Sequence, residues 1–413
     1  MRREQVERVV ACVDVGTSKI CTLIGEVDQS DDLRIVGVGI VPSRGIRKGV
    51  VVNVQEATDA ILASVERAER LAGYEIESAY VGLAGAHISS INSRGAVAIN
   101  RGERGVQPSD IERALDAARA IPIPYNRQVL HAIPRSYILD GDDGVRDPLG
   151  MQAYRLEVEA HIITGATTSI QNLVKCVQAT GLGIEALILE PLASGEAVLT
   201  DVEREMGVAL VDIGGGTTDI AVFIEGSIWH TVVLPIGGEQ ITHDIAVGLR
   251  TPFSTAEELK IKYGNACPRN VQVEDLLEVT VFGEGDSQKV SRHFLAQIIE
   301  ARVEEIFELV HQEIKRSGYD GLLPAGIVLC GGSADLAGIR DVARDVLGLP
   351  VRIGVPHNLR GLVDALGRPA YATSVGLLHW GLRRDLGQVT RPPRGEGFKI
   401  LDWLKALLPD RSA

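Results

Sequence analysis

Two short segments of the chain place an aspartate directly before glycines and hydroxyl residues. The first is Asp14-Val-Gly-Thr-Ser-Lys19, and the second is Asp212-Ile-Gly-Gly-Gly-Thr-Thr-Asp219. Glycine lets backbone N–H groups approach an anion closely, and the hydroxyl groups add further hydrogen-bond donors. The pattern therefore predicts phosphate-binding turns made by Gly16, Thr17, Ser18 and Lys19 in the first copy, and by Gly214, Gly215, Gly216 and Thr217 in the second.

The two aspartates indicate a metal ion, because a carboxylate repels phosphate. A Mg²⁺ ion keeps several of its waters and is commonly held through carboxylates and phosphate oxygens. We therefore expect Asp14 and Asp212 to face Mg²⁺ through water, with Lys19 as a point charge for a terminal phosphate. A single copy fits an ordinary hairpin turn equally well, but the repetition favours a nucleotide site.

A third glycine turn follows the apolar run 327–330. Gly331, Gly332 and Ser333 come directly after this predicted strand, and a helix is expected to follow through about residue 347. A strand, a glycine turn and a helix N-terminus form a natural site for an anion and a flat base. Cys330 lies at the end of the apolar strand, which favours a buried structural thiol over a nucleophile.

The elements that must position these turns form a repeated pattern. Runs rich in β-branched residues at 9–14, 20–27 and 33–41 predict an antiparallel meander, and 208–212, 219–224 and 228–234 predict a second. Helical patterns follow each meander, so the sequence indicates an internal duplication with two lobes facing a cleft. Prolines and glycines interrupt the pattern from about 85 to 164, which predicts an inserted subdomain.

Length and composition limit the classes of protein to which this chain can belong. The 413 residues exceed one ordinary core, and 45% hydrophobic with 23% charged residues predict a folded globular protein. The net charge of −13 disfavours nucleic-acid binding. No apolar run approaches the roughly 18 residues that span a bilayer, and five cysteines without a Cys-x-x-Cys pair favour reduced thiols in a cytoplasm.

The C-terminal residues predict a tether followed by an amphipathic helix. Residues 383–396 are polar and rich in glycine, proline and charge, which is typical of a flexible linker. The helix expected at 397–409 suits a membrane interface, with Phe398, Ile400, Leu401, Trp403, Leu404, Leu407 and Leu408 as its apolar side chains. The alternative is a helix docked on the body or in a partner's groove, and the tether argues against docking on the body.

Taken together, these motifs resemble the five-part nucleotide signature of the actin, heat-shock-chaperone and sugar-kinase superfamily. The two remaining parts are Glu190-Pro-Leu-Ala-Ser and Ala372-Thr-Ser-Val-Gly. Within that superfamily the inserted segment resembles the FtsA family of bacterial cell division proteins, on the motifs that span 81–95, 131–141 and 146–151. The resemblance covers nearly the whole chain.

The resemblance implies an α/β, actin-like fold with duplicated ribonuclease-H-like lobes around a nucleotide cleft. The first lobe would comprise 1–84, 163–197 and 355–382, with the inserted α+β subdomain at 85–162. The second lobe would comprise 198–237 and 303–354, with a further subdomain at 238–302. The linker and the amphipathic helix complete the chain.

The resemblance also implies roles for individual residues. ATP and Mg²⁺ would be the cofactors, and Glu190 would orient the attacking water. Glu257 and Lys260 would line the ribose and adenine, although an ion pair on a solvated helix face is the simpler interpretation. Arg302 would suit an acidic partner tail, and an ion pair with Glu305 is its alternative.

The function implied is that of an actin-like, at most slowly ATP-hydrolysing protein at the division site. It would polymerise on the cytoplasmic face of the cell membrane, bind the C-terminal tail of the tubulin-like FtsZ, and contact other division proteins. Two alternatives remain at this stage: a cytoplasmic pilus-assembly adaptor resembling PilM, and a small-molecule kinase of the same superfamily. Nucleic acid is not an expected partner.

Overall fold

The computed structural model describes residues 8–30, 32–99, 105–282 and 287–382. Two five-stranded sheets form the centre of the molecule, and they share one topology: an antiparallel meander followed by parallel strands. The first runs β11-β6-β1-β2-β3 and comprises Gly183–Leu189, Ser78–Leu83, Arg8–Val15, Lys19–Val27 and Leu33–Pro42. The second runs β14-β13-β12-β17-β18 and comprises Ser227–Leu234, Thr218–Ile224, Val208–Ile213, Ile327–Cys330 and Val351–Ile353. Both predicted meanders and the duplication are confirmed.

Helices cover the first sheet on both faces, which explains why its central strands β1 and β2 are buried along most of their length. Helices α1 (Val54–Ala72) and α3 (Thr167–Gln178) pack together on one face, and α10 (Ala372–Leu382) packs on the strands of the other. Helix α1 begins at Asn53, whose side chain accepts a hydrogen bond from the Glu56 N–H, and it ends at Gly73, whose φ of 85° favours glycine. A short hairpin of β4 (Ile46–Arg47) and β5 (Val50–Val51) precedes α1.

Strand β12 separates two hydrophobic cores. Val208 and Leu210 belong to the core that continues into the first lobe, whereas Ala209, Val211 and Ile213 belong to the core of the second lobe. This alternation is the period of two that a strand imposes. Helices α4 (Glu190–Val198) and α10 pack against each other on the side of the first core, so they join the lobes at their base. Helices α8 (Arg292–Ser317) and α9 (Ile339–Leu347) contribute apolar side chains to the core of the second lobe.

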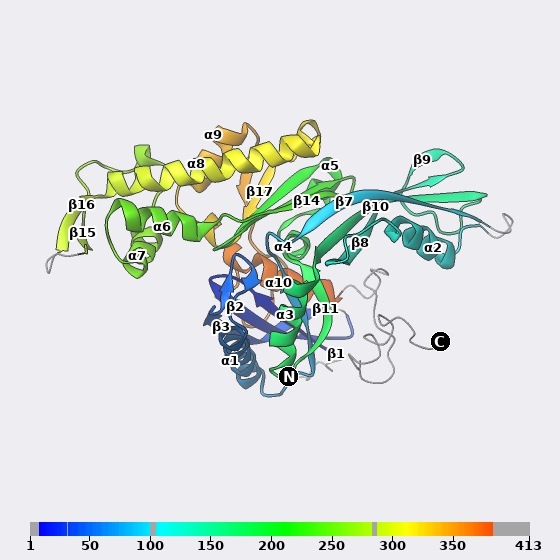
Figure 1. Ribbon diagram of the computed structural model, residues 1–413, viewed down its shortest axis with the longest axis horizontal. Coiled ribbons are helices and arrows are strands. Elements are labelled where there is room, and N and C mark those ends of the chain that lie inside the picture. The colour runs from blue at the N-terminus through cyan, green and yellow to red at the C-terminus, as the bar shows by residue number, and fades with distance from the viewer. Residues whose placement is uncertain (1–7, 31, 100–104, 283–286, 383–413) are drawn as a thin grey trace, which may run out of the picture.

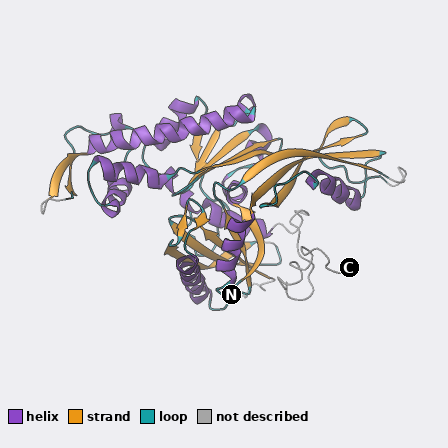
Figure 2. Cartoon of the chain, viewed as in Figure 1, coloured by secondary structure: helices purple, strands orange, loops and turns teal. Residues whose placement is uncertain are grey.

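Two extensions leave the lobes at opposite ends of the molecule (Figure 1). One is the inserted subdomain, whose sheet has the order β7-β10-β8-β9 with α2 packed against it, over Ser89–Ala98, Arg155–Ala166, Arg127–Leu139, Asp142–Val145 and Pro108–Arg119. The other is a helical arm, in which α6 (Gly238–Gly248), α7 (Phe253–Tyr263) and a hairpin of β15 (Leu276–Thr280) and β16 (Ser287–Ser291) meet the N-terminal part of α8. Figure 2 shows the contrast: the inserted subdomain is mostly strand, and the arm is mostly helix.

The inserted subdomain branches from the first lobe but docks on the second. Its strands lie beside β14, where the Ser90 hydroxyl donates to the Thr231 carbonyl at 2.8 Å and the Asn92 amide donates to the Trp229 carbonyl at 3.4 Å. The buried His161 ring hydrogen-bonds the Thr231 hydroxyl at 2.9 Å. Arg135 stacks over the Trp229 ring with its guanidinium 4.0 Å from the centroid. The subdomain therefore spans both lobes.

All five cysteines are free and buried, as the sequence predicted. Within the described ranges, every helix is too short or too polar to cross a bilayer. The expected linker and amphipathic helix at 383–409 lie outside the described residues.

A polar cluster joins the end of α4 to the second lobe. Helix α5 (Asp201–Met206) begins with a capping box in which the Glu203 carboxylate accepts from the Thr200 N–H at 2.8 Å. Arg352 on β18 donates to the same carboxylate at 2.7 Å and to the Val198 carbonyl at 2.7 Å. Burial alone would raise the pKa of Glu203, but these donors outweigh it and hold that pKa at about 2.

This cluster predicts an acid-dependent loss of stability. Because the folded pKa of Glu203 lies below its ordinary value of 4.5, the stabilisation is present above that value and is lost as the pH falls toward 2. Glu203→Gln should therefore cost about 1.5 kcal/mol of unfolding free energy at pH 7. The difference from the parent should shrink as the pH falls from 5 toward 3, measured by urea denaturation.

Glu258→Gln is the matched control, because the Glu258 pair with Lys262 is exposed on both sides. We expect a change below about 0.5 kcal/mol for this variant. If Glu203→Gln and Glu258→Gln lost the same free energy of unfolding, the stabilising role of the Glu203 cluster would be contradicted.

Candidate functional site

Four carboxyl groups from the two lobes interact within one desolvated region. Asp14 is the penultimate residue of β1, Asp212 and Asp219 pair across β12 and β13, and Glu190 is the first residue of α4. The three aspartates are 2–6% exposed. Burial, with repulsion from Asp212, raises the pKa of Asp219 to about 8. Burial and the aspartates raise the pKa of Glu190 well above its usual range, and Lys19 opposes them. A positive charge placed among these carboxyl groups would offset their mutual repulsion.

Hydroxyl groups from α4 and α10 hold the two predicted metal-facing aspartates in place. The Ser374 hydroxyl donates to Asp14 at 2.6 Å, although burial still raises the pKa of Asp14. The hydroxyls of Ser194 and Thr373 donate to one oxygen of Asp212 at 2.6 and 3.2 Å. The sequence motifs at 190–194 and 372–376 contain these residues, but the sequence analysis assigned them no role.

Sequence reasoning also assigned no role to Asp219, although it stands in the second phosphate motif. Its Oδ1 atom is buried and has no hydrogen-bond partner among the described residues. The antiparallel pairing of β12 with β13 places Asp219 opposite Asp212. Its position at the end of the second glycine motif was the available signal in the sequence.

The two predicted phosphate turns contact each other across the lobes. A Cβ on Gly215 would stand 2.0 Å from the Ser18 hydroxyl, and a Cβ on Gly216 would stand 2.8 Å from the Thr17 hydroxyl. The Gly214 N–H closes its own turn on the Thr217 carbonyl at 2.9 Å. The Ser18 hydroxyl can rotate away from Gly215, but a Cβ on Gly216 would also stand 2.9 Å from the Lys48 Cα atom, so glycine is required at 216 for the close approach of the backbones.

Gly16 shows the same constraint in the first turn, because a Cβ there would stand 2.8 Å from the Lys19 carbonyl. The Lys19 ammonium donates to the Ala370 carbonyl at 2.6 Å and lies 5.0 Å from the centre of the Tyr371 ring. The structure thus anchors Lys19 against the turn before α10, while its charge still lowers the pKa values of Asp14 and Glu190.

The third glycine turn reaches the same region, but not as a helix N-terminus. A 3₁₀ turn over Gly332–Asp335 follows β17 and α9 spans Ile339–Leu347, so the predicted helix is confirmed, but its N-terminus lies beyond the glycine turn. Gly331 has a φ of 84°, and a Cβ there would stand 2.3 Å from Asp212 Oδ1. The Ser333 hydroxyl donates to the Gly214 carbonyl at 3.2 Å. The chain turns tightly here because Asp212 occupies the space.

The start of α6 completes the site, and sequence reasoning missed it. The Gly238 and Glu239 N–H groups donate to the carbonyls of Gly214 and Gly215 at 2.9 and 2.8 Å. A Cβ on Gly237 would stand 2.7 Å from the Gly214 carbonyl. The pair Gly237-Gly238 before a helical pattern was the available signal.

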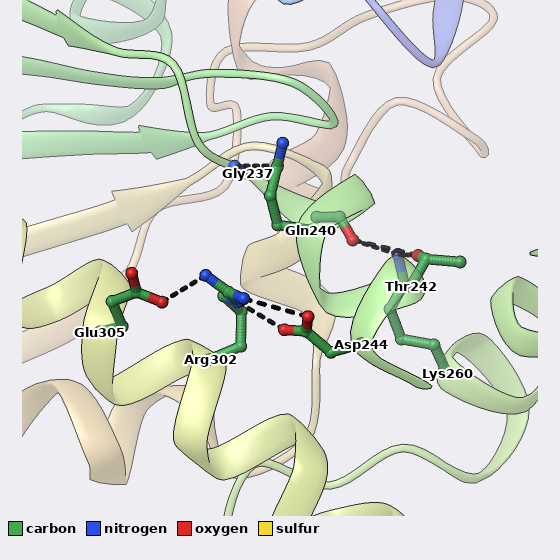
Figure 3. Close-up of polar contacts among 8 residues, drawn as sticks. Gly237, Gln240, Thr242, Asp244, Lys260, Arg302 and Glu305 are labelled. Carbon is green, nitrogen blue, oxygen red and sulfur yellow. Dashed lines mark hydrogen bonds and ion pairs between the residues drawn. The ribbon is translucent and has the colours of Figure 1, made fainter. Parts of the chain in front are cut away.

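Lys260 and Glu257 lie against this helix start. Their ion pair at 2.7 Å is the simpler interpretation considered from sequence. However, the Lys260 ammonium also donates to the Gly238 carbonyl at 3.0 Å and to the Thr242 hydroxyl at 2.8 Å, as Figure 3 shows in part. Lys260 is therefore fixed beside the second glycine turn.

Arg302 belongs to α8, and its side chain is bound to residues of α6 and of α8 itself. Its guanidinium donates to both oxygens of Asp244, at 2.5 and 3.0 Å, and also pairs with Glu305 (Figure 3). The Glu305 pair was the alternative considered from sequence, and the Asp244 pair was not foreseen.

Within the described ranges, no three histidine, cysteine, aspartate or glutamate side chains converge closely enough to ligate a metal ion. Asp14 and Asp212 lie on different strands and are held by hydroxyl groups. This arrangement fits an ion held through its own waters, because Mg²⁺ dehydrates reluctantly.

Solved structures share this fold over almost the whole chain. The chain superposes on a chain of the PilM–PilN type IV pilus biogenesis complex with a TM-score of 0.65 and 17% identity, covering 91% of this chain and 99% of that one. MreB5 of Spiroplasma citri, bound to ADP, gives a TM-score of 0.53 at 15% identity, covering 91% and 96%. Two duplicated lobes that bring paired aspartate and glycine turns together define an actin-like protein.

Sequence comparison identifies the family within this class. The model of the SHS2 domain inserted in FtsA matches 85–164, and the model of cell division protein FtsA matches 209–376. Cell division protein FtsA of Pseudomonas aeruginosa is 46% identical over 398 residues, which cover 96% of this chain and 95% of that protein. The protein of Neisseria meningitidis is 45% identical over 393 residues, covering 95% and 94%. The chain belongs to the FtsA family, and its role is in cell division; the pilus-adaptor alternative is not favoured.

The packing of α10 on α4 predicts a stability defect. A Cβ on Gly376 would stand 1.7 Å from the Ala193 carbonyl, so the helices must separate to accept it. Gly376→Ala should lose about 2 kcal/mol of unfolding free energy in urea denaturation. At Gly367 a Cβ would meet no atom of the described residues within 4 Å, so Gly367→Ala should fold with parental stability. A stable Gly376→Ala variant would contradict the close contact.

Proposed function

We propose that the protein binds ATP with Mg²⁺ between its two lobes. The observation that carries this proposal is the set of four desolvated carboxyl groups beside three glycine turns. Asp14 and Asp212 would hold the ion through water, and the ion would supply the positive charge that these carboxylates lack. The turns at 16–19 and 214–217 would contact the phosphates, and the turn at 331–333 with Glu257 and Lys260 would lie toward the nucleoside.

Hydrolysis, if it occurs, depends on Glu190 in this proposal. Glu190 stands beside Asp14 and is the only one of the four carboxyl groups that begins a helix. A nearby cation lowers the pKa of a carboxyl group, so the loaded site would favour the ionised form that can orient a water. The rate would be slow, and ATP would act chiefly as a ligand that shifts the lobes between conformations.

The division role would be carried out at the membrane. We propose that copies of the chain polymerise on the cytoplasmic face at the division site and attach the FtsZ ring there, with other division proteins as further partners. The FtsZ tail would bind the helical arm, where Arg302 offers a guanidinium to an acidic peptide. Arg302 is engaged by Asp244 and Glu305 in the structure, so a tail carboxylate would have to exchange with one of them.

The membrane contact would come from the helix at 397–409. Its apolar side chains, with tryptophan among them and lysines beside them, suit a helix lying in the interface. One short helix binds weakly, so many copies in a filament would strengthen attachment through multivalency.

The nucleotide proposal is tested at Asp212. Asp212→Ala removes one of the two carboxylates proposed to hold the ion, and it should weaken ATP·Mg²⁺ binding by more than about tenfold in calorimetry. Asp345→Ala is the control, because that aspartate is half exposed on α9 of the same lobe. Unchanged affinity in Asp212→Ala would refute the assignment.

The membrane proposal is tested by truncation after Leu382. In co-sedimentation with vesicles of phosphatidylglycerol and phosphatidylethanolamine, the full chain should pellet with ATP·Mg²⁺ present and the truncated chain should stay in solution. ATP binding should be the same for both, which shows that the truncated chain is folded. If both chains stay in solution, the helix has another partner, and a soluble substrate of a small-molecule kinase becomes the next candidate.

A further inference from the structure

A buried histidine of the inserted subdomain touches the backbone next to Glu190. His131 lies on β8 and is 5% exposed. Its Nε2 atom accepts a hydrogen bond from the Leu189 N–H at 3.1 Å, in a fully buried contact. Leu189 ends β11 and is the residue from which α4 starts, so the next residue along the chain is Glu190.

Among the described residues no side chain caps the first N–H groups of α4, and the N–H that His131 binds is that of the N-cap residue itself. Leu189 occupies the N-cap position and has no polar side chain to offer to the first N–H groups of the helix. A backbone N–H that is buried without an acceptor costs free energy, so the direction of the chain at this point depends on where an acceptor stands. The acceptor for the Leu189 N–H is His131, which belongs to a different subdomain and lies 58 residues away in sequence.

The imidazole ring of His131 is suited to accept a hydrogen bond. Burial lowers the pKa of His131 to about 4, so the ring is neutral near pH 7 and one nitrogen keeps its lone pair. The hydrogen bond to Leu189 identifies Nε2 as that nitrogen. The Trp380 ring of α10 packs beside it, with the ring centroids 6.2 Å apart. His131 therefore contacts both helices that hold the site, α4 through the backbone and α10 through Trp380.

We propose that His131 is a positioning residue for Glu190, and that through it the docking of the inserted subdomain is coupled to the nucleotide site. This inference rests on the proposed nucleotide function. The subdomain is fixed on its other side to β14 by His161 and Arg135. A shift of the subdomain on the second lobe moves β8, and with it the acceptor for Leu189. By linkage, a nucleotide that favours one position of Glu190 favours the matching position of the subdomain.

The test compares two replacements of His131 in the full chain. His131→Gln places an amide oxygen near the position of Nε2, and His131→Met fills the space without a comparable acceptor. The readout is amide hydrogen exchange of the segment 186–192, measured by mass spectrometry without nucleotide. His131→Met should speed exchange there by about tenfold, and His131→Gln should stay near the parent.

Ser78→Ala is the matched control. The Ser78 hydroxyl bonds the Glu185 carboxylate at 2.6 Å at an exposed place on the same pair of strands, away from Glu190. This variant should leave exchange at 186–192 unchanged. Parental exchange in His131→Met would overturn the inference. Equal acceleration in His131→Met and His131→Gln would also overturn it, because it would show that the ring acts by packing alone.

A second measurement separates this inference from the nucleotide proposal. Addition of ATP·Mg²⁺ should slow exchange at 186–192 in the parent and in His131→Gln, and should do so less in His131→Met. If ATP·Mg²⁺ binds none of the proteins, the nucleotide proposal and the coupling both fail, and the nucleotide-free exchange still decides whether His131 positions Leu189. If all three proteins respond to the same extent, the coupling is refuted while the nucleotide proposal stands.

Discussion

The structure depends on four acidic side chains placed where water is largely excluded. Asp14, Glu190, Asp212 and Asp219 come from both lobes, and their mutual repulsion in a desolvated site is costly. Hydroxyl groups of α4 and α10, the Lys19 ammonium and raised pKa values reduce that cost without removing it. The close glycine turns and the tight packing of the two helices follow from the need to hold these groups at fixed positions.

Much of this arrangement was predictable from the sequence, because its signals are local. An aspartate followed by glycines and a run of β-branched residues that forms a strand each occupy a short stretch of chain. The contacts that were missed join distant stretches. Ser374 meets Asp14 across 360 residues, and Gly238 meets Gly214 only because β14 returns the chain to the site. The 3₁₀ turn at Gly332 was missed because it is set by the space that Asp212 leaves, which no local pattern encodes.

Fold and family were settled by different observations. The likeness to PilM and MreB5 concerns the shared lobes, and at 15–17% identity it shows architecture alone. Membership in the FtsA family rests on sequence identity of 45–46% along nearly the whole chain and on the inserted SHS2 domain. The insertion is also where the structure departs most from a simple pair of lobes, since it contacts the second lobe while its His131 contacts the first.

The side chains of β7 that bind the carbonyl groups of β14 have a consequence for self-association. Thr231 and Trp229 stand two residues apart, so their carbonyls point to the same side of the strand, and Ser90 and Asn92 occupy them. Open strand edges otherwise recruit further strands and lead to uncontrolled aggregation. Because polar side chains terminate the ladder here, one copy cannot extend the sheet of another at this border. Any contact between two copies at this border would therefore be made by side chains rather than by strand pairing.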